Sequence, residues 1–151
     1  MASSLSNVLV HIVFATKLRQ PFLQHLSSRV AMHRYLANVS GRLACPTVAV
    51  GGVADHVHIL ARQARTITMA EWVKELKRVS SLWAKGVAPD LADFQWQEGY
   101  GAFSVSQSLS SEVQMYIEQQ AQHHQTSDFQ NEMRTLFAHH EIAYDERYVW
   151  D

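Results

Sequence analysis

The segment Asn7–Thr16 constrains the fold most strongly, because it alternates like a strand and is apolar on both faces. Every second residue from Val8 to Phe14 is apolar, and so are the residues between them except His11. A strand with two apolar faces must be covered on both sides. The pattern therefore predicts a strand in the interior of a sheet.

Length and composition indicate one soluble globular unit. With 151 residues, the chain suffices for one ordinary domain but not for two, so we expect a single domain, 1–151. No apolar run approaches the roughly 20 residues of a membrane helix. The start, Met-Ala-Ser-Ser-Leu-Ser, lacks the features of a secretory signal, so we expect a cytoplasmic location. Cys45 is the single cysteine, which excludes an internal disulfide and favours a small buried apolar residue.

Charge is divided along the sequence, although the net charge is only −1. Residues 1–86 hold 11 of the 13 lysines and arginines, whereas residues 87–151 hold 11 of the 14 acids. A basic portion is the electrostatic signature of a polyanion-binding surface. The alternative, that both portions fold into one mixed surface, stays open.

Two further pairs of strands are expected. Thr47–Val53 and His56–Arg62 are β-rich runs joined at Ala54-Asp55, so they predict an antiparallel hairpin with His56 at the start of its second strand. Phe94–Trp96 and Ala102–Gln107 resemble a second hairpin around the glycines of Gly99-Tyr100-Gly101.

Helical spacing and capping signals predict four helices. The first covers Phe22–Gly41, with Gly41 as its stop. Thr68 and Glu71 form a capping box that opens the second helix. The third runs to about His124 after a cap at Ser108 or Ser110, and the fourth follows a capping box of Ser127 and Gln130. The aromatic tail beyond Ile142 is expected to dock on the body of the protein.

The second helix carries a basic outer stripe of the kind that contacts phosphates. The stripe contains Lys74, Lys77 and Arg78. Solvated lysines on a surface helix are an equally ordinary explanation of the same pattern.

His56-Val57-His58, together with Tyr116 and Gln120, predicts a metal-held phosphate site. Residues two apart on a strand share a face, so both imidazoles can point at one cation. Residues four apart on a helix are neighbours, so the Tyr116 hydroxyl and the Gln120 carbonyl can approach the same cation. The ion would polarise a phosphodiester, which a tyrosine hydroxyl can attack to form a covalent intermediate. Structural histidines and a packed surface tyrosine remain the alternatives.

Five ordered segments, spread over essentially the whole chain, resemble the single-tyrosine HUH transposases of the insertion-sequence two-hundred type. This group includes relatives associated with repetitive extragenic palindromes. One mild departure is Gln119, where the resemblance leads us to expect asparagine. The segments are His11–Lys17, Gly51–Leu60, Trp72–Ser81, Trp96–Ser106 and Tyr116–His124, and the closing Tyr144–Asp151 is also similar.

The resemblance implies an α+β fold with a ferredoxin-like core, an antiparallel sheet flanked by helices. It implies that His56, His58 and Gln120 bind Mg²⁺ or Mn²⁺ and that Tyr116 is the nucleophile. The implied activity is cleavage and rejoining of single-stranded DNA at hairpin-bearing ends through a 5′-phosphotyrosine, with no nucleotide cofactor and no membrane partner. A homodimer is expected, and the tyrosine could act within or across subunits.

DNA contacts are assigned, as a hypothesis, to the basic residues after the first strand and on the second helix. Trp83, Trp96 and Tyr100 could stack on bases or pack in the core. Three other functions stay open: a domesticated endonuclease that processes chromosomal palindromes, a catalytically silent nucleic-acid-binding module, and a metal hydrolase that uses water. The assigned DNA contacts are Lys17, Arg19, Lys74, Lys77 and Arg78.

Overall fold

β1 (Leu9–Ala15) lies in the interior of a four-stranded antiparallel sheet, as its two apolar faces predict. The strand order is β2-β3-β1-β4, with β2 (Thr47–Gly52), β3 (His56–Arg62) and β4 (Gly101–Val105). The structure, a computed structural model, describes residues 3–124 and 127–151. Met1 and Ala2 lie outside the described residues. They belong to the N-terminal segment for which no secretory signal is expected.

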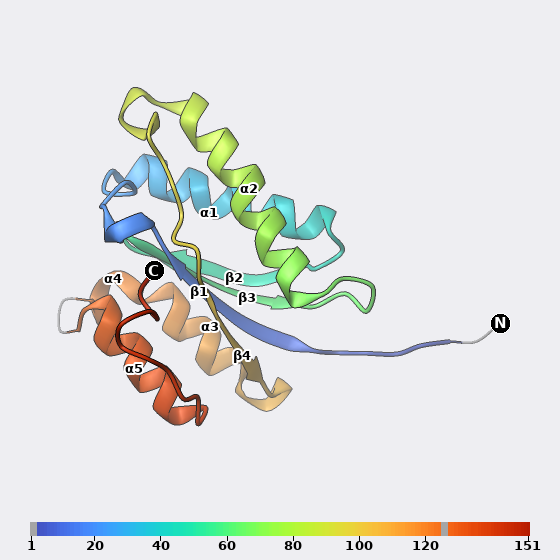
Figure 1. Cartoon of the computed structure of the whole chain (residues 1–151). Helices are drawn as coiled ribbons and strands as arrows, with labels where there is room; N and C mark the ends of the chain where they lie inside the picture. The colour runs from blue at the N-terminus through green and yellow to red at the C-terminus, as the bar shows by residue number, and fades with distance from the viewer. Residues whose placement is uncertain (1–2, 125–126) are drawn as a thin grey trace.

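Helices cover both faces of the sheet (Figure 1). One face carries α1 and α2, and the other carries α3, α4 and α5, which come last in the chain. The order β1-α1-β2-β3-α2-β4 with this strand arrangement is the expected α+β, ferredoxin-like core. The helices are α1 (Leu26–Arg42), α2 (Met69–Val87), α3 (Ser110–Glu118), α4 (Gln120–His123) and α5 (Phe129–His139), with short 3-10 turns at Lys17–Arg19, Pro89–Leu91 and Gln107–Leu109.

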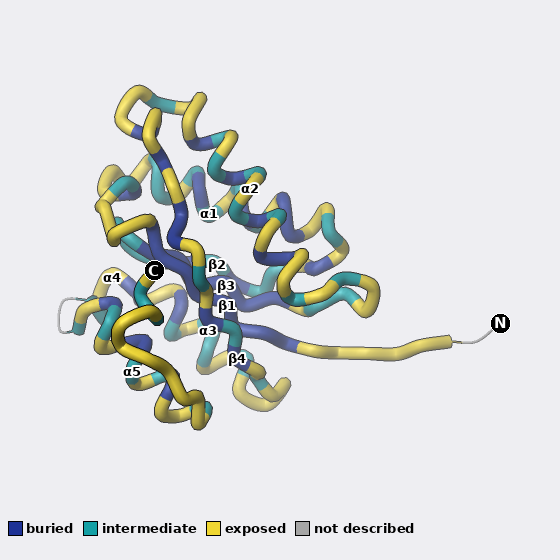
Figure 2. Tube along the Cα trace, in the orientation of Figure 1, coloured by how far each residue is buried: buried dark blue, intermediate teal, exposed yellow. Residues whose placement is uncertain are grey.

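The alternation of each strand divides the core into two layers. Ile12, Phe14 and Ile59 belong to the larger cluster, which also holds residues of α1 and α2. Val13 and Leu60 point to the opposite face and pack in clusters that hold residues of α5 and α3. The two central strands, β1 and β3, are accordingly buried along most of their length, whereas the outer strands β2 and β4 are only partly buried (Figure 2).

Both ends of α1 differ from those expected. α1 begins at Leu26 instead of Phe22, and it runs through Gly41 to Arg42. The chain turns beyond this helix at Ala44, whose φ of 61° lies in the left-handed region. Gly41 is therefore an interior helical residue, and its prediction as the stop was wrong.

The predicted cap of α2 is confirmed, because the Thr68 hydroxyl accepts a 3.1 Å hydrogen bond from the Glu71 N–H. The predicted cap of α5 was wrong by one residue. Asp128, and not Ser127, caps it, since the Asp128 carboxylate accepts a 2.8 Å bond from the Asn131 N–H.

Neither Ser108 nor Ser110 caps the helix that carries Tyr116. α3 begins at Ser110 after Leu109, with no side-chain cap, and a break at Gln119 separates it from α4. The expected helix to about His124 is thus two shorter helices in succession.

The predicted second hairpin, Phe94–Trp96 with Ala102–Gln107, was wrong. Trp96 bridges to Thr16, and β4 pairs antiparallel with β1 further along, so both segments run in the same direction beside β1. Between them, the Gln97 backbone N–H donates to the Ala15 carbonyl at 2.8 Å. The Gln97 side-chain carbonyl accepts from the Ala15 N–H at 2.6 Å. The glycines here allow a bulge instead of a reversal.

The C-terminal tail docks as expected. The ring of Tyr144 packs 4.8 Å from that of Phe137, and the Asp151 carbonyl accepts bonds from the Gly99 N–H and the Gln97 side chain. Cys45 is buried in the larger cluster. Among the described residues, no helix has both the length and the apolarity to cross a membrane.

Candidate metal and tyrosine site

β3 presents His56 and His58 on the face covered by α3, α4 and α5. The strand alternation sends Val57 to the opposite layer, so the two imidazoles share one side, as predicted. Both are fully buried, and their partners on β1 are the small residues Ala15 and Val13. The room for two rings therefore comes from small neighbours on the central strand.

Each histidine is held through its Nδ1 atom, so its Nε2 atom points to a common centre. The Asp55 carboxylate lies 2.7 Å from His56 Nδ1. His11 Nε2 lies 2.8 Å from His58 Nδ1, and the two share one proton. Such partners fix the tautomer and orientation of an imidazole that binds a metal.

The two histidines have opposite charge preferences. Burial lowers the pKa of His56, but the hydrogen bonds that its ring donates to the Asp55 and Glu132 carboxylates outweigh burial and raise the pKa to about 9. Burial dominates at His58 and lowers its pKa to about 4. Burial, with the neighbouring His58, lowers the pKa of His11 to about 3. In the metal-free protein at neutral pH, His56 therefore carries the positive charge.

α3 and α4 bring Tyr116 and Gln120 to the same centre, as the spacing of four residues predicts. The Gln120 carbonyl oxygen lies 3.3 Å from His56 Nε2, and its side chain is buried. The half-buried Tyr116 ring stands edge-on to that of His58, with centroids 5.7 Å apart. Tyr116 and Gln120 thus approach the histidine pair of their own chain.

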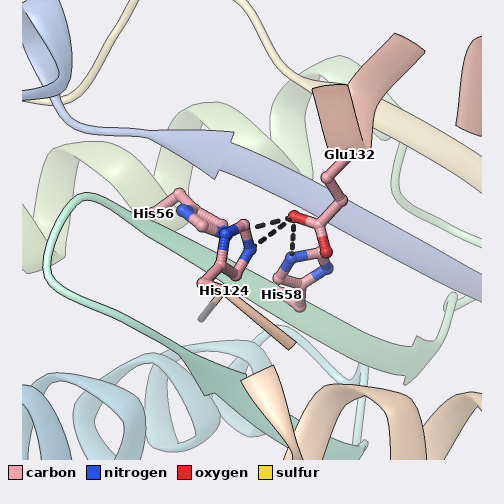
Figure 3. A group of neighbouring side chains, drawn as sticks. All are labelled: His56, His58, His124 and Glu132. Atoms are coloured by element: carbon pink, nitrogen blue, oxygen red, sulfur yellow. Dashed lines mark hydrogen bonds and ion pairs between the residues drawn. The ribbon is translucent and has the colours of Figure 1, made fainter. Parts of the chain in front are cut away.

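Glu132 of α5 lies at the centre of this group, and the sequence reasoning missed it (Figure 3). Its side chain is 1% exposed, and its Oε1 atom lies 3.2, 3.1 and 3.0 Å from Nε2 of His56, His58 and His124. Its Oε2 atom accepts hydrogen bonds from the Gln120 amide, at 3.1 Å, and from the Tyr116 hydroxyl.

A sequence signal for Glu132 did exist. It lies three residues after Phe129 and beside Met133, on the apolar face of the predicted helix, where an unpaired acid is costly. Asp55, next to the histidine pair, and His124, at the end of the predicted third helix, were also missed as members of the site.

Burial and the neighbouring Glu132 together set the charge state of the nucleophile candidate. Burial by itself raises the pKa of the Glu132 carboxyl, but the surrounding histidines outweigh it and keep the pKa far below its usual range. Burial and this negative charge raise the pKa of Tyr116 well above its usual value. Tyr116 is therefore a neutral hydroxyl in the metal-free protein.

The donor set fits a divalent metal ion. His56, His58, His124 and Glu132 offer ligand atoms that all lie within 4.8 Å of one another. Imidazole nitrogen suits borderline ions, and carboxylate and amide oxygens suit Mn²⁺ and Mg²⁺. The expected ligands His56, His58 and Gln120 are thus brought together, and the group is compatible with a metal.

The predicted DNA-contacting residues gather at a cleft of about 830 Å³ lined by Lys17, Lys74, Lys77 and Arg78. Arg19 is not among its lining residues. The Lys77 ammonium donates to the carbonyls of residues 97–99 at 2.7–3.1 Å, so it holds the bulge beside β4. Lys17 and Lys74 are exposed.

The three aromatic candidates for base stacking differ in their surroundings. Trp96 is buried, and its indole N–H donates to Ser80 at 2.9 Å. Trp83 stacks on Tyr35, with ring centroids 4.5 Å apart. Tyr100 is 40% exposed and lines the cleft. Core packing therefore accounts for the two tryptophans, and Tyr100 remains accessible.

Comparison with known proteins points to one family. The family model described as "Transposase IS200 like" matches residues 4–120. A solved protein described as a transposase from Deinococcus radiodurans R1 is similar over 80% of this chain and 95% of its own, with 22% identity and a TM-score of 0.61. No curated protein sequence matches the chain.

A second solved structure is a REP-associated tyrosine transposase bound to a REP hairpin. It is similar over 78% of this chain and 66% of its own, with 11% identity and a TM-score of 0.52. At these identities, the two structures establish a shared fold. The family match ends at Gln120, before His124 and Glu132.

Proposed function

Because the chain belongs to the IS200-like transposase family, we propose that it cleaves and rejoins single-stranded DNA through a 5′-phosphotyrosine at Tyr116. The observation that carries this proposal is that the Tyr116 hydroxyl and the Gln120 amide both donate to Glu132, whose other carboxylate oxygen lies against the two buried histidines. A silent DNA-binding module would need no such group, and a buried set of polar groups is costly to maintain.

The reaction requires an exchange of two phosphorus–oxygen bonds. The Tyr116 oxygen forms a bond to the phosphorus and gives up its proton, while the bond to the 3′-oxygen breaks. That oxygen leaves with the electron pair and takes up one proton to become a 3′-hydroxyl, so the proton lost by Tyr116 is balanced by the one gained there. In rejoining, another 3′-hydroxyl attacks the phosphotyrosine and Tyr116 regains a proton. The bond energy is conserved in the intermediate, so no nucleotide cofactor is needed.

The residues around Tyr116 supply orientation and charge. His56, His58 and Gln120 would hold Mg²⁺ or Mn²⁺, which when bound neutralises negative charge at the phosphate. Asp55 and His11 orient the two imidazoles through their Nδ1 atoms. The edge-on contacts of Tyr116 with the rings of His11 and His58 hold the phenol at the centre.

The basic cleft is proposed to hold the DNA. Lys17 and Lys74 are exposed cations for phosphates, and Tyr100 offers a ring for an unpaired base. Arg78 shares its charge with Glu75 at 2.8 Å, so it is a weaker phosphate contact. The solved neighbour bound to a REP hairpin supports hairpin DNA as the substrate class. A homodimer remains part of the proposal.

A covalent adduct tests the proposal. Single-stranded DNA from the palindromes of the protein's own locus, labelled at the 3′ end, is incubated with the protein and Mn²⁺ and resolved under denaturing conditions. We expect a shifted, labelled protein band that Tyr116→Phe abolishes. Tyr35→Phe, on the opposite face of the sheet, is the matched control and should keep the band. A band that persists in Tyr116→Phe would identify another nucleophile, and hydrolysis without any band would favour a water-using hydrolase.

A further inference from the structure

Glu132 lies outside everything that the family match covers, yet it is the most central residue of the site. The match ends at residue 120, whereas Glu132 enters from α5. Its carboxylate is 1% exposed, and Oε1 has three imidazole nitrogens within 3.2 Å. A carboxylate this deeply buried needs a compensating positive charge.

The three imidazoles cannot all donate to Oε1 at once. A charged His56 can donate one ring proton to Asp55 and the other to Oε1, but the Nε2 atoms of His58 and His124 lie equally close to Oε1. One carboxylate oxygen has only about two lone-pair sites for these three nitrogens. A metal ion among these atoms removes this conflict, because the nitrogens then face the ion through their lone pairs.

The three separations from Oε1 are compatible with neighbouring ligands of one ion, and the four candidate ligand atoms all lie within 4.8 Å of one another. With ligand atoms about 2.1 Å from a metal, two ligands at angles of roughly 90–110° are about 3.0–3.4 Å apart. The separations from Oε1 to the three Nε2 atoms, 3.2, 3.1 and 3.0 Å, fall in this range. Oε2 meanwhile bonds to Tyr116 and Gln120, so the carboxylate links the imidazoles to the tyrosine helix.

We propose that Glu132, through Oε1, and His124, through Nε2, are additional ligands of the divalent ion held by His56, His58 and Gln120. The inference rests on the proposed function for the presence of that ion. It adds a negative charge and a third imidazole to the expected ligands. Because imidazole ligands disfavour Mg²⁺ relative to later divalent ions, the site should prefer Mn²⁺ over Mg²⁺.

If Glu132 instead blocked the metal site, its removal would change the metal affinity in the opposite direction. If the carboxylate occupied the place of the ion and had to leave before metal could bind, its removal would strengthen metal binding. If it is a ligand, its removal weakens binding. The sign of the change therefore separates the two roles without any measurement of activity.

The experiment measures Mn²⁺ binding to the full chain by calorimetry at pH 7.5, without DNA. Loss of a residue that only hydrogen-bonds to a metal ligand already costs about 10–100-fold in metal affinity. We therefore expect Glu132→Gln to weaken Mn²⁺ binding by ~100-fold or more. Glu118→Gln, which removes the same charge from an exposed position on α3, is the matched control and should bind as the wild type does. Unchanged or tighter binding by Glu132→Gln would overturn the proposal.

Two further measurements keep the test decisive. Thermal melts in EDTA establish that Glu132→Gln is folded, and His124→Ala provides a second variant at a less buried position. We expect His124→Ala to weaken Mn²⁺ binding by at least ~10-fold. Equal affinity in His124→Ala would remove His124 from the ligand set. In the wild type, Mg²⁺ should compete with Mn²⁺ only in large excess, and equal competition would contradict the third imidazole.

Failure of the ligand assignment can be distinguished from failure of the proposed function. If Glu132→Gln binds Mn²⁺ normally while the wild type forms the Tyr116 adduct, the ligand assignment fails and the function stands. If Mn²⁺ binding depends on Glu132 but no adduct forms, the ligand assignment stands and the function fails.

Discussion

Asp55 shows how one residue next to the histidine pair supports both the fold and the site. Its backbone carbonyl accepts a 2.8 Å bond from the Thr16 N–H, which ties the β2–β3 turn to the end of β1. Its side chain holds His56 Nδ1 at 2.7 Å. A metal-binding imidazole usually has such an outer partner, which raises the basicity of the ligand nitrogen.

Replacement of Asp55 by asparagine should lower the pKa of His56. The amide oxygen can still accept the Nδ1 proton, but the negative charge that favours imidazolium is lost. We expect the pKa of His56 to fall from about 9 by at least about one unit, measured by NMR titration of the ring in EDTA. Mn²⁺ affinity should fall about 10–100-fold. Asp93→Asn, at an exposed position, is the control, and an unchanged pKa in Asp55→Asn would refute the role of this charge.

At the scale of elements, the close approach of α3 to the edge strand β2 positions the tyrosine. A Cβ atom on Gly51 would lie 2.2 Å from the Ile117 carbonyl oxygen and 2.9 Å from its Cγ2 atom. Ile117 follows Tyr116 directly, and it is fully buried against this strand. Glycine at this position therefore sets the distance between the sheet and the nucleophile.

Gly51→Ala should displace α3 and weaken the site. Because the added carbon meets backbone, the helix must move, and overpacking of this kind costs about 1–3 kcal/mol. We expect a lower melting temperature and slower adduct formation. Gly41→Ala is the control, since its Cβ would meet nothing within 4 Å and alanine is the better helix former. Equal melting temperatures for the two variants would show that β2 tolerates a side chain here.

At the scale of the whole molecule, buried histidines couple stability to pH. Mainly through burial, the pKa of His11, His33 and His58 is lowered to about 3, 4 and 4. That of His56 is raised to about 9. Among these four histidines the folded protein thus favours three neutral imidazoles and one charged one, and the two kinds respond to pH with opposite sign.

The metal-free protein should be most stable at about pH 7, where proton uptake by the unfolded chain at three histidines balances proton release at the fourth. From pH 6.5 towards pH 4.5 the unfolded chain binds protons that the three neutral histidines do not bind in the folded state, so the free energy of unfolding falls by ~2 kcal/mol per histidine. Between pH 6.5 and 8 the loss of the His56 contribution, roughly 1–2 kcal/mol, is largely offset by the three neutral histidines, so the net decline is below about 1 kcal/mol. Above pH 8, Lys77, whose pKa burial lowers to about 8, opposes this decline.

Denaturant melts in EDTA across pH 4.5–8 measure the two limbs. His56→Gln is the diagnostic variant, because it should abolish the decline between pH 6.5 and 8 and leave the acid limb in place. A wild-type protein whose stability keeps rising from pH 6.5 to 8 would show that His56 is not charged in the folded state.

Much of the fold could be predicted because its determinants are local. The two apolar faces of Asn7–Thr16 predict the interior strand, and the Thr68 cap predicts the start of α2. His56 and His58 share a face because strand residues repeat every two positions, whatever the rest of the chain does. The approach of Tyr116 and Gln120 follows in the same way from the turn of a helix, even across the break at Gln119.

The tertiary structure alone decided which distant groups meet. Glu132 and His58 are 74 positions apart, and no local period relates a residue of α5 to a strand so distant in the chain. The segments around Trp96 and Phe103 look like a hairpin in sequence, because a glycine-rich bulge and a reversal use the same residues, and only pairing with β1 separates the two. The sequence by itself determined which residues share a face on each element, since that is a property of backbone geometry. Packing of the two helical layers determined that a buried carboxylate completes the histidine cluster, since that depends on contacts between elements far apart in the chain.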